Sequence, residues 1–367
     1  MGTFIPQMEP VITDADRAAV DAYLASGGWL TEFEQTRLLE KSICDYTGAR
    51  YCVMAPSGTL ALFLALAACG IGRDDEVIVP DLTMAASATA VILAGGKVMF
   101  ADIDPDTFCL DLDRAEQAIS DRTKAVMFVS LNGRAPAGLP AFIARCRARG
   151  VRIIEDAAQS LGSFSSGRHL GTLGDCGCFS FSSQKIVTTG QGGAVVTNDE
   201  GLAGRMKLLR DFGRLEGGSD RYLEVGWNLK FTDLQAVIGL EQMKRLPELV
   251  SRKRAIFDAY RQGLCGIPGV VVPDTDLESV TPWFMDILVS NGGRDRVMDH
   301  LRQQGVGSRP IYPALHTAPA FLQSASYPVA EDVSARGLWL PSSLRLKDQE
   351  IAFICESVRG FLSREAA

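Results

Sequence analysis

Residues 51–103 read YCVMAPSGTLALFLALAACGIGRDDEVIVPDLTMAASATAVILAGGKVMFADI, and this stretch decides the fold class. Three short apolar runs, at 51–56, 76–80 and 97–103, are separated by helical patterns at 59–70 and 83–96. Both helical patterns end in glycine, a common signal for the end of a helix. Strands that are apolar along their whole length and alternate with helices are typical of a parallel sheet covered on both faces. The stretch therefore predicts an α/β fold.

The same alternation continues toward the middle of the chain. Helical patterns and apolar runs follow in turn at 111–119 (helix), 124–131 (strand), 137–150 (helix) and 151–157 (strand). Two further apolar runs, CGCFSFS at 176–182 and GGAVVTN at 192–198, are too close together for a helical crossover. We expect these two strands to pair antiparallel within an otherwise mostly parallel sheet.

The last part of the chain has a different character. From about residue 198 the pattern is helical, and a smaller mixture of strands and helices follows residue 266. We predict an N-terminal segment (1–30) that packs on the small domain, a large domain (31–250) and a small C-terminal α+β domain (251–367).

Composition narrows the classes of function. The chain has 367 residues and a net charge of −7, without a basic block, so nucleic-acid binding is not expected. No apolar stretch is long enough to span a bilayer, and the start of the chain does not resemble a secretory signal. The nine cysteines are scattered and lack a second close pair or a histidine cluster, which argues against a metal site. We expect buried thiols and a cytoplasmic protein.

Polar residues at the ends of the predicted strands are the first candidates for a ligand site, because ligands bind there in parallel sheets. Ser57 and Gly58 lie between a strand and a helix, where free backbone N–H groups favour a phosphate. Such a Ser-Gly pair is more often only a helix cap. Asp156 ends another buried strand, with Gln159 one turn later. Asp156 either caps the next helix or is a buried carboxylate that needs a cation as its partner.

A single lysine, Lys185, lies between the two predicted antiparallel strands. Its neighbours are hydroxyl residues and glycines, namely Ser180, Ser182, Ser183, Thr188, Thr189, Gly190, Gly192 and Gly193. A solvated surface lysine needs no such surroundings, although most lysines are of that kind. A desolvated lysine has a lowered pKa and can form a Schiff base. A phosphate site, a carboxylate for a pyridinium nitrogen and a Schiff-base lysine together indicate pyridoxal phosphate.

Several motifs carry a resemblance to a known family. They are GGWLTEFEQTRLLEKSICDYTGARYCVMAPSGTLAL (27–62), RDDEVIVPDLTMAASATAV (73–91), IIEDAAQSLGS (153–163), GTLGDCGCFSFSSQKIVTTGQGGAVVTND (171–199), VGWNLKFTDLQAVIGLEQM (225–243) and GVGSRPIYPALH (305–316). The chain resembles, over nearly its whole length, the fold-type-I pyridoxal-phosphate enzymes that aminate keto-sugars, the nucleotide-sugar aminotransferases. The resemblance implies a homodimer with active sites at the subunit interface. It also implies transfer of an amino group from glutamate to a keto-sugar, in the synthesis of surface polysaccharide or lipopolysaccharide.

The resemblance implies a role for each matching residue. Lys185 forms the Schiff base and moves protons, Asp156 pairs with the pyridinium nitrogen, and Gln159 lies against the cofactor ring. The other implied cofactor contacts are Ser57, Gly58, Thr59 and Ser180 around the phosphate, Met84 over the ring, and Asn228 reaching the phosphate of the partner subunit's cofactor. Some relatives have a histidine in place of Lys185 and are dehydratases, and others are regulators without activity. A lyase or dehydratase and a non-catalytic regulatory protein therefore stay as alternatives.

The substrate is less defined by the sequence. Many members of the family have His-x-Tyr-Gly where this chain has Leu131-Asn132-Gly133-Arg134 within VSLNGRAP (129–136). Arg134 and Arg309 are candidate cations for a carboxylate or a diphosphate, and His316 matches a family position near the sugar. A solvated loop arginine is an equally good interpretation of Arg134. The chain is similar both to enzymes that aminate the terminal carbon of a keto-octulosonate and to perosamine synthases, which aminate a GDP-4-keto-6-deoxy sugar.

Overall fold

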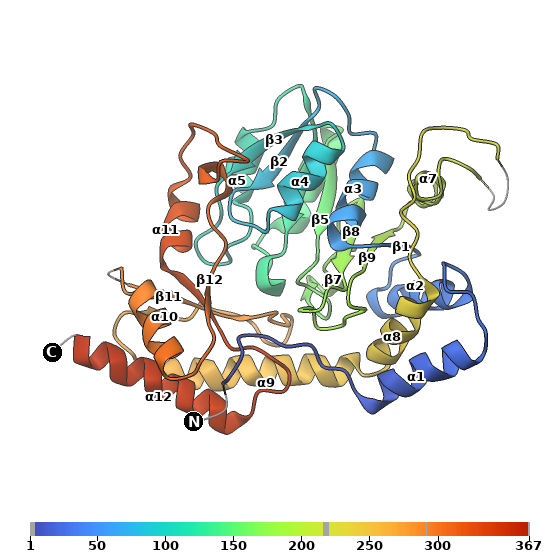
Figure 1. Cartoon of the computed structure of the whole chain (residues 1–367). Helices are drawn as coiled ribbons and strands as arrows, with labels where there is room; N and C mark the ends of the chain where they lie inside the picture. The colour runs from blue at the N-terminus through green and yellow to red at the C-terminus, as the bar shows by residue number, and fades with distance from the viewer. Residues whose placement is uncertain (1–3, 216–219, 291, 366–367) are drawn as a thin grey trace.

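The computed structural model describes residues 4–215, 220–290 and 292–365, and a seven-stranded sheet forms its centre (Figure 1). In spatial order the strands are β1 (Tyr51–Ala55), β9 (Gly193–Thr197), β8 (Cys176–Ser180), β5 (Arg152–Asp156), β4 (Thr123–Val129), β2 (Glu76–Pro80) and β3 (Lys97–Ala101). From β8 to β3 all neighbours are parallel, and β9 alone among the seven runs the other way. The mostly parallel sheet expected from the sequence is confirmed.

The antiparallel pairing of β8 with β9 is also as predicted, and its register runs from Gly177 opposite Val196 to Ser180 opposite Gly193. The twelve residues between the two strands contain no helix, which leaves no room for a parallel crossover. This connection carries Lys185. A small ribbon, β6 (Phe164–Ser165) with β7 (Arg168–His169), lies between β5 and β8 in the chain.

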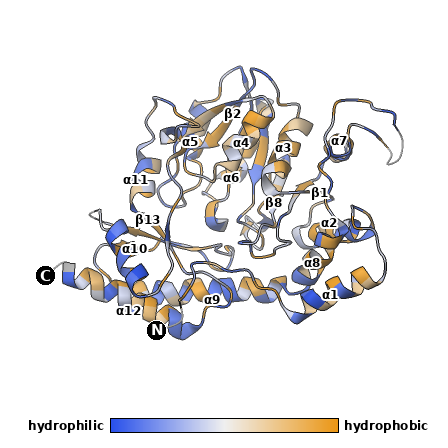
Figure 2. Cartoon of the chain, viewed as in Figure 1, coloured by the Kyte–Doolittle hydropathy of each residue, from blue (hydrophilic) through white to orange (hydrophobic). Residues whose placement is uncertain are grey.

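Helices pack on this sheet or on one another. We call the seven-stranded sheet with these helices the large domain, and the four-stranded sheet with its helices the small domain. The helices of the large domain are α2 (Glu34–Thr47), α3 (Gly58–Ala68), α4 (Ala86–Leu93), α5 (Leu112–Gln117), α6 (Leu139–Ala148), α7 (Glu200–Arg210) and α8 (Asp233–Lys244), with a 3-10 turn at Leu131–Gly133. The α3 sequence GTLALFLALAA is apolar on every side, as expected of a helix that is buried all round. Figure 2 shows α4 mainly in orange, whereas α1 carries both blue and orange residues.

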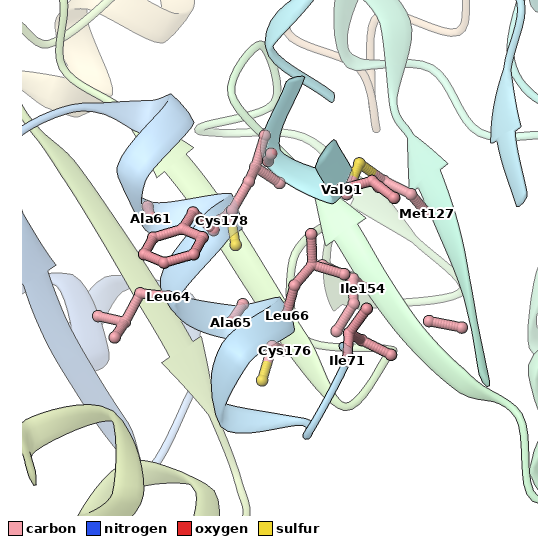
Figure 3. Packing of buried hydrophobic residues seen from close by; sticks show 14 of the residues in the cluster. Ala61, Leu64, Ala65, Leu66, Ile71, Val91, Met127, Ile154, Cys176 and Cys178 are labelled. Carbon is pink, nitrogen blue, oxygen red and sulfur yellow. The ribbon is translucent and has the colours of Figure 1, made fainter. Parts of the chain in front are cut away.

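The core between α3, α4 and the sheet is closely packed. Figure 3 shows side chains of α3 beside Met127 of β4, Ile154 of β5 and the thiols of Cys176 and Cys178 of β8. Both thiols are buried, as expected for cysteines that act as small apolar residues. This packing holds the first turn of α3 against the ends of the central strands.

The small domain contains an antiparallel sheet in the order β10 (Val270–Val271), β11 (Met285–Val289), β13 (Gly337–Leu340) and β12 (Arg309–Pro310). Its helices are α10 (Arg294–Gln303), α11 (Pro328–Arg336) and α12 (Asp348–Glu365), with a 3-10 turn at Leu315–Thr317. The long helix α9 (Leu246–Leu264) lies beside α12 and extends toward α8 (Figure 1). Near the N-terminus, Ile5 pairs with Val306, and α1 (Asp14–Ala25) packs against α8.

Within the described residues, no helix combines the length and the apolar character that crossing a membrane requires.

Candidate active site

A cavity of about 360 Å³ lies where the carboxyl ends of β5 and β8 face the first turn of α3. Eight of the nine predicted cofactor residues line it, namely Ser57, Gly58, Thr59, Met84, Asp156, Gln159, Ser180 and Lys185. Arg309, a predicted substrate contact, lines it as well. Residues separated by up to 255 positions in the sequence thus line one cavity.

The start of α3 forms one wall of the cavity. The Ser57 hydroxyl accepts a hydrogen bond from the Leu60 backbone N–H (3.2 Å), so Ser57 caps the helix as the sequence suggested. The N–H groups of Gly58 and Thr59 are in the first turn, where a helix offers no carbonyl partner. A Cβ atom on Gly58 would be only 2.9 Å from Cβ of Ser180, so glycine permits this close approach. The geometry suits an anion at the N-terminus of a helix.

Asp156 lies at the end of β5, and its carboxylate is buried. It accepts hydrogen bonds from the Ser87 hydroxyl (2.7 Å) and from the Ala158 N–H (3.1 Å). Burial raises the pKa of Asp156, whereas these two donors and the nearby Lys185 lower it. A cation inside the cavity would stabilise the ionised carboxylate.

Lys185 lies in a turn between β8 and β9, where its N–H donates to the Ser182 carbonyl (2.9 Å). Burial lowers the pKa of Lys185 to about 8, while Asp156 acts in the opposite direction. Its Nζ lies 4.0 Å from the centre of the Trp283 ring. Lys185 thus has an amine that loses its proton close to neutral pH, within the same cavity as Asp156.

Gln159 is held by two residues that the sequence analysis did not assign to the site. Its Oε1 accepts from the Asn132 N–H (2.7 Å), and its Nε2 donates to the Tyr312 hydroxyl (3.3 Å). Tyr312 and Trp283 both line the cavity from the small domain. Tyr312 lies within the family motif GVGSRPIYPALH and Trp283 lies in PWFMDI, but only folding brings the two side chains to the cavity.

Arg134, a predicted substrate contact, has its partners within the chain in this structure. Its guanidinium is buried and forms two hydrogen bonds to the Asp286 carboxylate (2.7 and 2.6 Å) and a third to the Thr275 hydroxyl (3.0 Å). Arg134 does not line the cavity. The fixed cation therefore already has its anion inside the protein, and a substrate cannot use it without breaking this pair.

His316 and Asn228 also lie outside the cavity wall. His316 is buried, with Nδ1 2.7 Å from Asp81 Oδ2 and Nε2 3.4 Å from Glu331 Oε1. His316 thus has these contacts within the chain, and its predicted contact with the sugar stays a prediction. Asn228 is exposed and pairs with Asp211 in a short bridge, so its predicted reach into a partner subunit stays a prediction.

The residues of the cavity fit pyridoxal phosphate. A helix N-terminus suits the phosphate, the buried Asp156 carboxylate suits a protonated ring nitrogen, and the Lys185 amine suits an aldehyde. All three line one cavity, which is the arrangement that a single small molecule carrying these groups needs.

Comparison with known proteins agrees with this chemistry. The sequence matches the DegT/DnrJ/EryC1/StrS aminotransferase family over residues 10–359. A GDP-perosamine synthase from Escherichia coli O157:H7 is 33% identical over 362 residues, which cover 98% of this chain and 99% of that protein. The aminotransferase TlmJ from Streptoalloteichus hindustanus is 32% identical with a TM-score of 0.94, over 99% of this chain and 100% of that chain. The PLP form of Spr1654 from Streptococcus pneumoniae is 28% identical with a TM-score of 0.91, over 98% of this chain and 99% of that chain.

These similarities confirm the predicted fold class, the aminotransferase activity and pyridoxal phosphate as the cofactor. This chain belongs to the DegT/DnrJ/EryC1/StrS aminotransferase family.

Proposed function

We propose that this protein is a sugar aminotransferase that moves an amino group from glutamate to a nucleotide-linked keto-sugar of the GDP-perosamine type, in surface polysaccharide synthesis. One observation carries the activity: Lys185, Asp156 and the start of α3 line one cavity. The similarity to a GDP-perosamine synthase supports the class of substrate. An acidic eight-carbon keto-sugar is the second candidate, because Arg309 lines the cavity and no described carboxylate forms an ion pair with it.

We assign the chemical roles as follows. Pyridoxal phosphate supplies an electron sink that lets a proton leave the carbon bearing the amine. Asp156 keeps the ring nitrogen of the cofactor protonated, and Lys185 bonds the cofactor and accepts or returns the proton at Nζ. A pKa of about 8 leaves part of the Lys185 population unprotonated at neutral pH, as a general base requires.

The proposal includes a homodimer in which Asn228 reaches the partner subunit's cofactor. Large apolar side chains are exposed on the segments around that residue and near the N-terminus: Val225 is 82% exposed, Leu215 76% and Trp29 69%. Such side chains gathered on a surface are typical of an interface between subunits. We also place the protein in the cytoplasm, because its nine cysteines are free thiols.

The absorbance spectrum of the purified protein, before and after addition of glutamate, tests the proposal. We expect a cofactor band that shifts with glutamate, and an aminated product by mass spectrometry when a GDP-4-keto-6-deoxy sugar is added. A folded Lys185→Ala variant should lose both the shift and the borohydride-trapped covalent adduct.

The other outcomes separate the alternatives. A cofactor band that does not shift when glutamate is added would favour a lyase or dehydratase. No band after addition of pyridoxal phosphate would remove the proposal and favour a regulatory protein. Amination of an eight-carbon keto acid in place of the GDP-sugar would select the second substrate.

A further inference from the structure

The indole ring of Trp283 lies directly against the amino group of Lys185. The Lys185 Nζ is 4.0 Å from the centre of this ring, well inside the range of about 6 Å over which a cation is attracted to an aromatic face. Trp283 comes from the segment that enters β11 of the small domain, and it is only 6% exposed. The small domain thus contributes the surface on which the Lys185 amine rests.

Trp283 also holds the backbone next to the lysine. Its Nε1–H donates a hydrogen bond to the carbonyl of Gln184 (2.8 Å), the residue immediately before Lys185. The indole therefore contacts the lysine at both ends, through the amino group and through the preceding peptide. The ring contact restricts the lysine side chain, and the hydrogen bond restricts the backbone that precedes it.

The indole itself has little freedom to turn. Its ring stacks on Phe284, with centres 3.7 Å apart and an angle of 20°, and meets Trp339 edge-on at 5.8 Å. The backbone carbonyl of Trp283 accepts a hydrogen bond from the buried Lys253 Nζ (2.8 Å). The aromatic surface under Lys185 is therefore preorganised by the core of the small domain.

Two charged residues near Lys185 act on its ammonium group in opposite directions. Asp156 at the end of β5 attracts the ammonium, and Arg309 of β12 lines the same cavity with a like charge. Without the ring, the protonated Lys185 amine would have only the Asp156 carboxylate and water as partners. The indole face offers it a third, apolar partner beside the cavity.

We infer that Trp283 is a positioning residue for Lys185: its ring face holds the amino group at the cavity wall, and its Nε1–H fixes the turn that carries the lysine. The inference rests on the proposed role of Lys185 as the residue that bonds the cofactor. Trp283 acts through Lys185, so its removal should slow bond formation and leave the initial docking of the phosphate at α3 intact.

Stopped-flow absorbance of the apoenzyme mixed with pyridoxal phosphate tests this, because it separates bond formation by Lys185 from the preceding docking step. Docking alone is measured with pyridoxine phosphate, which has no aldehyde. Above the Lys185 pKa of about 8 the amine is neutral, so there we expect Trp283→Leu to slow bond formation about tenfold through lost positioning and to change the docking constant by less than about twofold. Trp283→Phe keeps a ring face and should fall between Trp283→Leu and the wild type. Phe142→Leu, a buried aromatic change in α6, is the matched control and should match the wild-type rate.

A second measurement changes the electron density of the ring in the wild-type fold and uses Trp283→Phe only as its reference. Biosynthetic replacement of the four tryptophans by 5-fluorotryptophan weakens the negative ring face and keeps its shape and N–H. A weaker ring face stabilises the Lys185 ammonium less, so the pH at which bond formation reaches half its maximal rate should fall in the fluorinated wild type and stay unchanged when Trp283→Phe is fluorinated.

Bond formation at the wild-type rate in Trp283→Leu, or equal losses in docking and bonding, would overturn the inference. A wild-type apoenzyme that never bonds pyridoxal phosphate would instead overturn the proposed role of Lys185.

Discussion

Lys253 on α9 should make the stability of the protein depend on pH. Its side chain is buried, and Nζ donates hydrogen bonds to the carbonyls of Trp283 (2.8 Å) and Ser342 (2.6 Å). No carboxylate among the described residues forms an ion pair with it. Burial lowers the pKa of Lys253 from 10.5 to about 7. We predict that Lys253→Met removes a specific part of the pH dependence of unfolding.

The sign follows from where the proton is bound. Between pH 7 and pH 10.5 the unfolded chain keeps the Lys253 proton and the folded protein does not. The free energy of unfolding therefore rises with pH in this window, by up to about 1.4 kcal/mol per pH unit. From pH 7 to pH 9 the gain is about 2 kcal/mol, since the folded lysine is half titrated at the lower end. Methionine cannot titrate, so the variant should lack this gain.

Urea unfolding of the holoenzyme at fixed protein concentration, followed by fluorescence at several pH values, measures the effect. The difference between wild type and Lys253→Met should grow by about 2 kcal/mol from pH 7 to pH 9, and other titrating groups cancel in that difference. Lys244→Met is the control, because it removes an exposed lysine of α8 in place of the buried one. Parallel pH curves for wild type and Lys253→Met would refute the reasoning.

Three further predictions concern the site and its supports. Arg134→Met leaves the buried Asp286 without its cation and should lower the free energy of unfolding in urea by about 3–5 kcal/mol. The double variant Arg134→Met/Asp286→Leu should recover most of this loss, and no recovery would mean that the broken pair is not its cause. Asp156→Asn should still bind the cofactor by absorbance but turn over at least about 100-fold more slowly, and near-normal turnover would contradict the pairing with the ring nitrogen. Gly58→Ala puts a methyl group 2.9 Å from the side chain that ends β8, so cofactor affinity by fluorescence titration should fall about tenfold, whereas Gly204→Ala, in open space, should leave it unchanged.

The sequence predicted the parts of the site that local patterns determine. Asp156 ends one apolar strand, and Gly58 and Lys185 follow two others. The apolar composition of these strands identifies them in the sequence, so the place of the three residues at one edge of the sheet could be inferred. The pattern predicts a helix from residue 83, which includes Met84, but α4 begins only at Ala86. The residues before that helix are part of a loop, which lets Met84 line the cavity.

The contacts that the sequence could not reveal are all long-range. Arg134 finds Asp286 across 152 positions, and no pattern near either residue indicates the other. Trp283 contacts Lys185 from a different domain, and its own segment is an apolar run with no feature that indicates this contact. Partners of this kind depend on how two domains pack, which apolar periodicity does not encode.

The helix α9 has a consequence for how the protein unfolds. Leu246 and Val250 near its start belong to the large-domain core, whereas Phe257 and Tyr260 near its end belong to the small-domain core. The boundary expected after residue 250 therefore falls inside one continuous helix. Unfolding of either core removes α9 side chains that pack in the other core. Calorimetry should therefore show one shared transition, and fragments cut at this boundary should not fold independently.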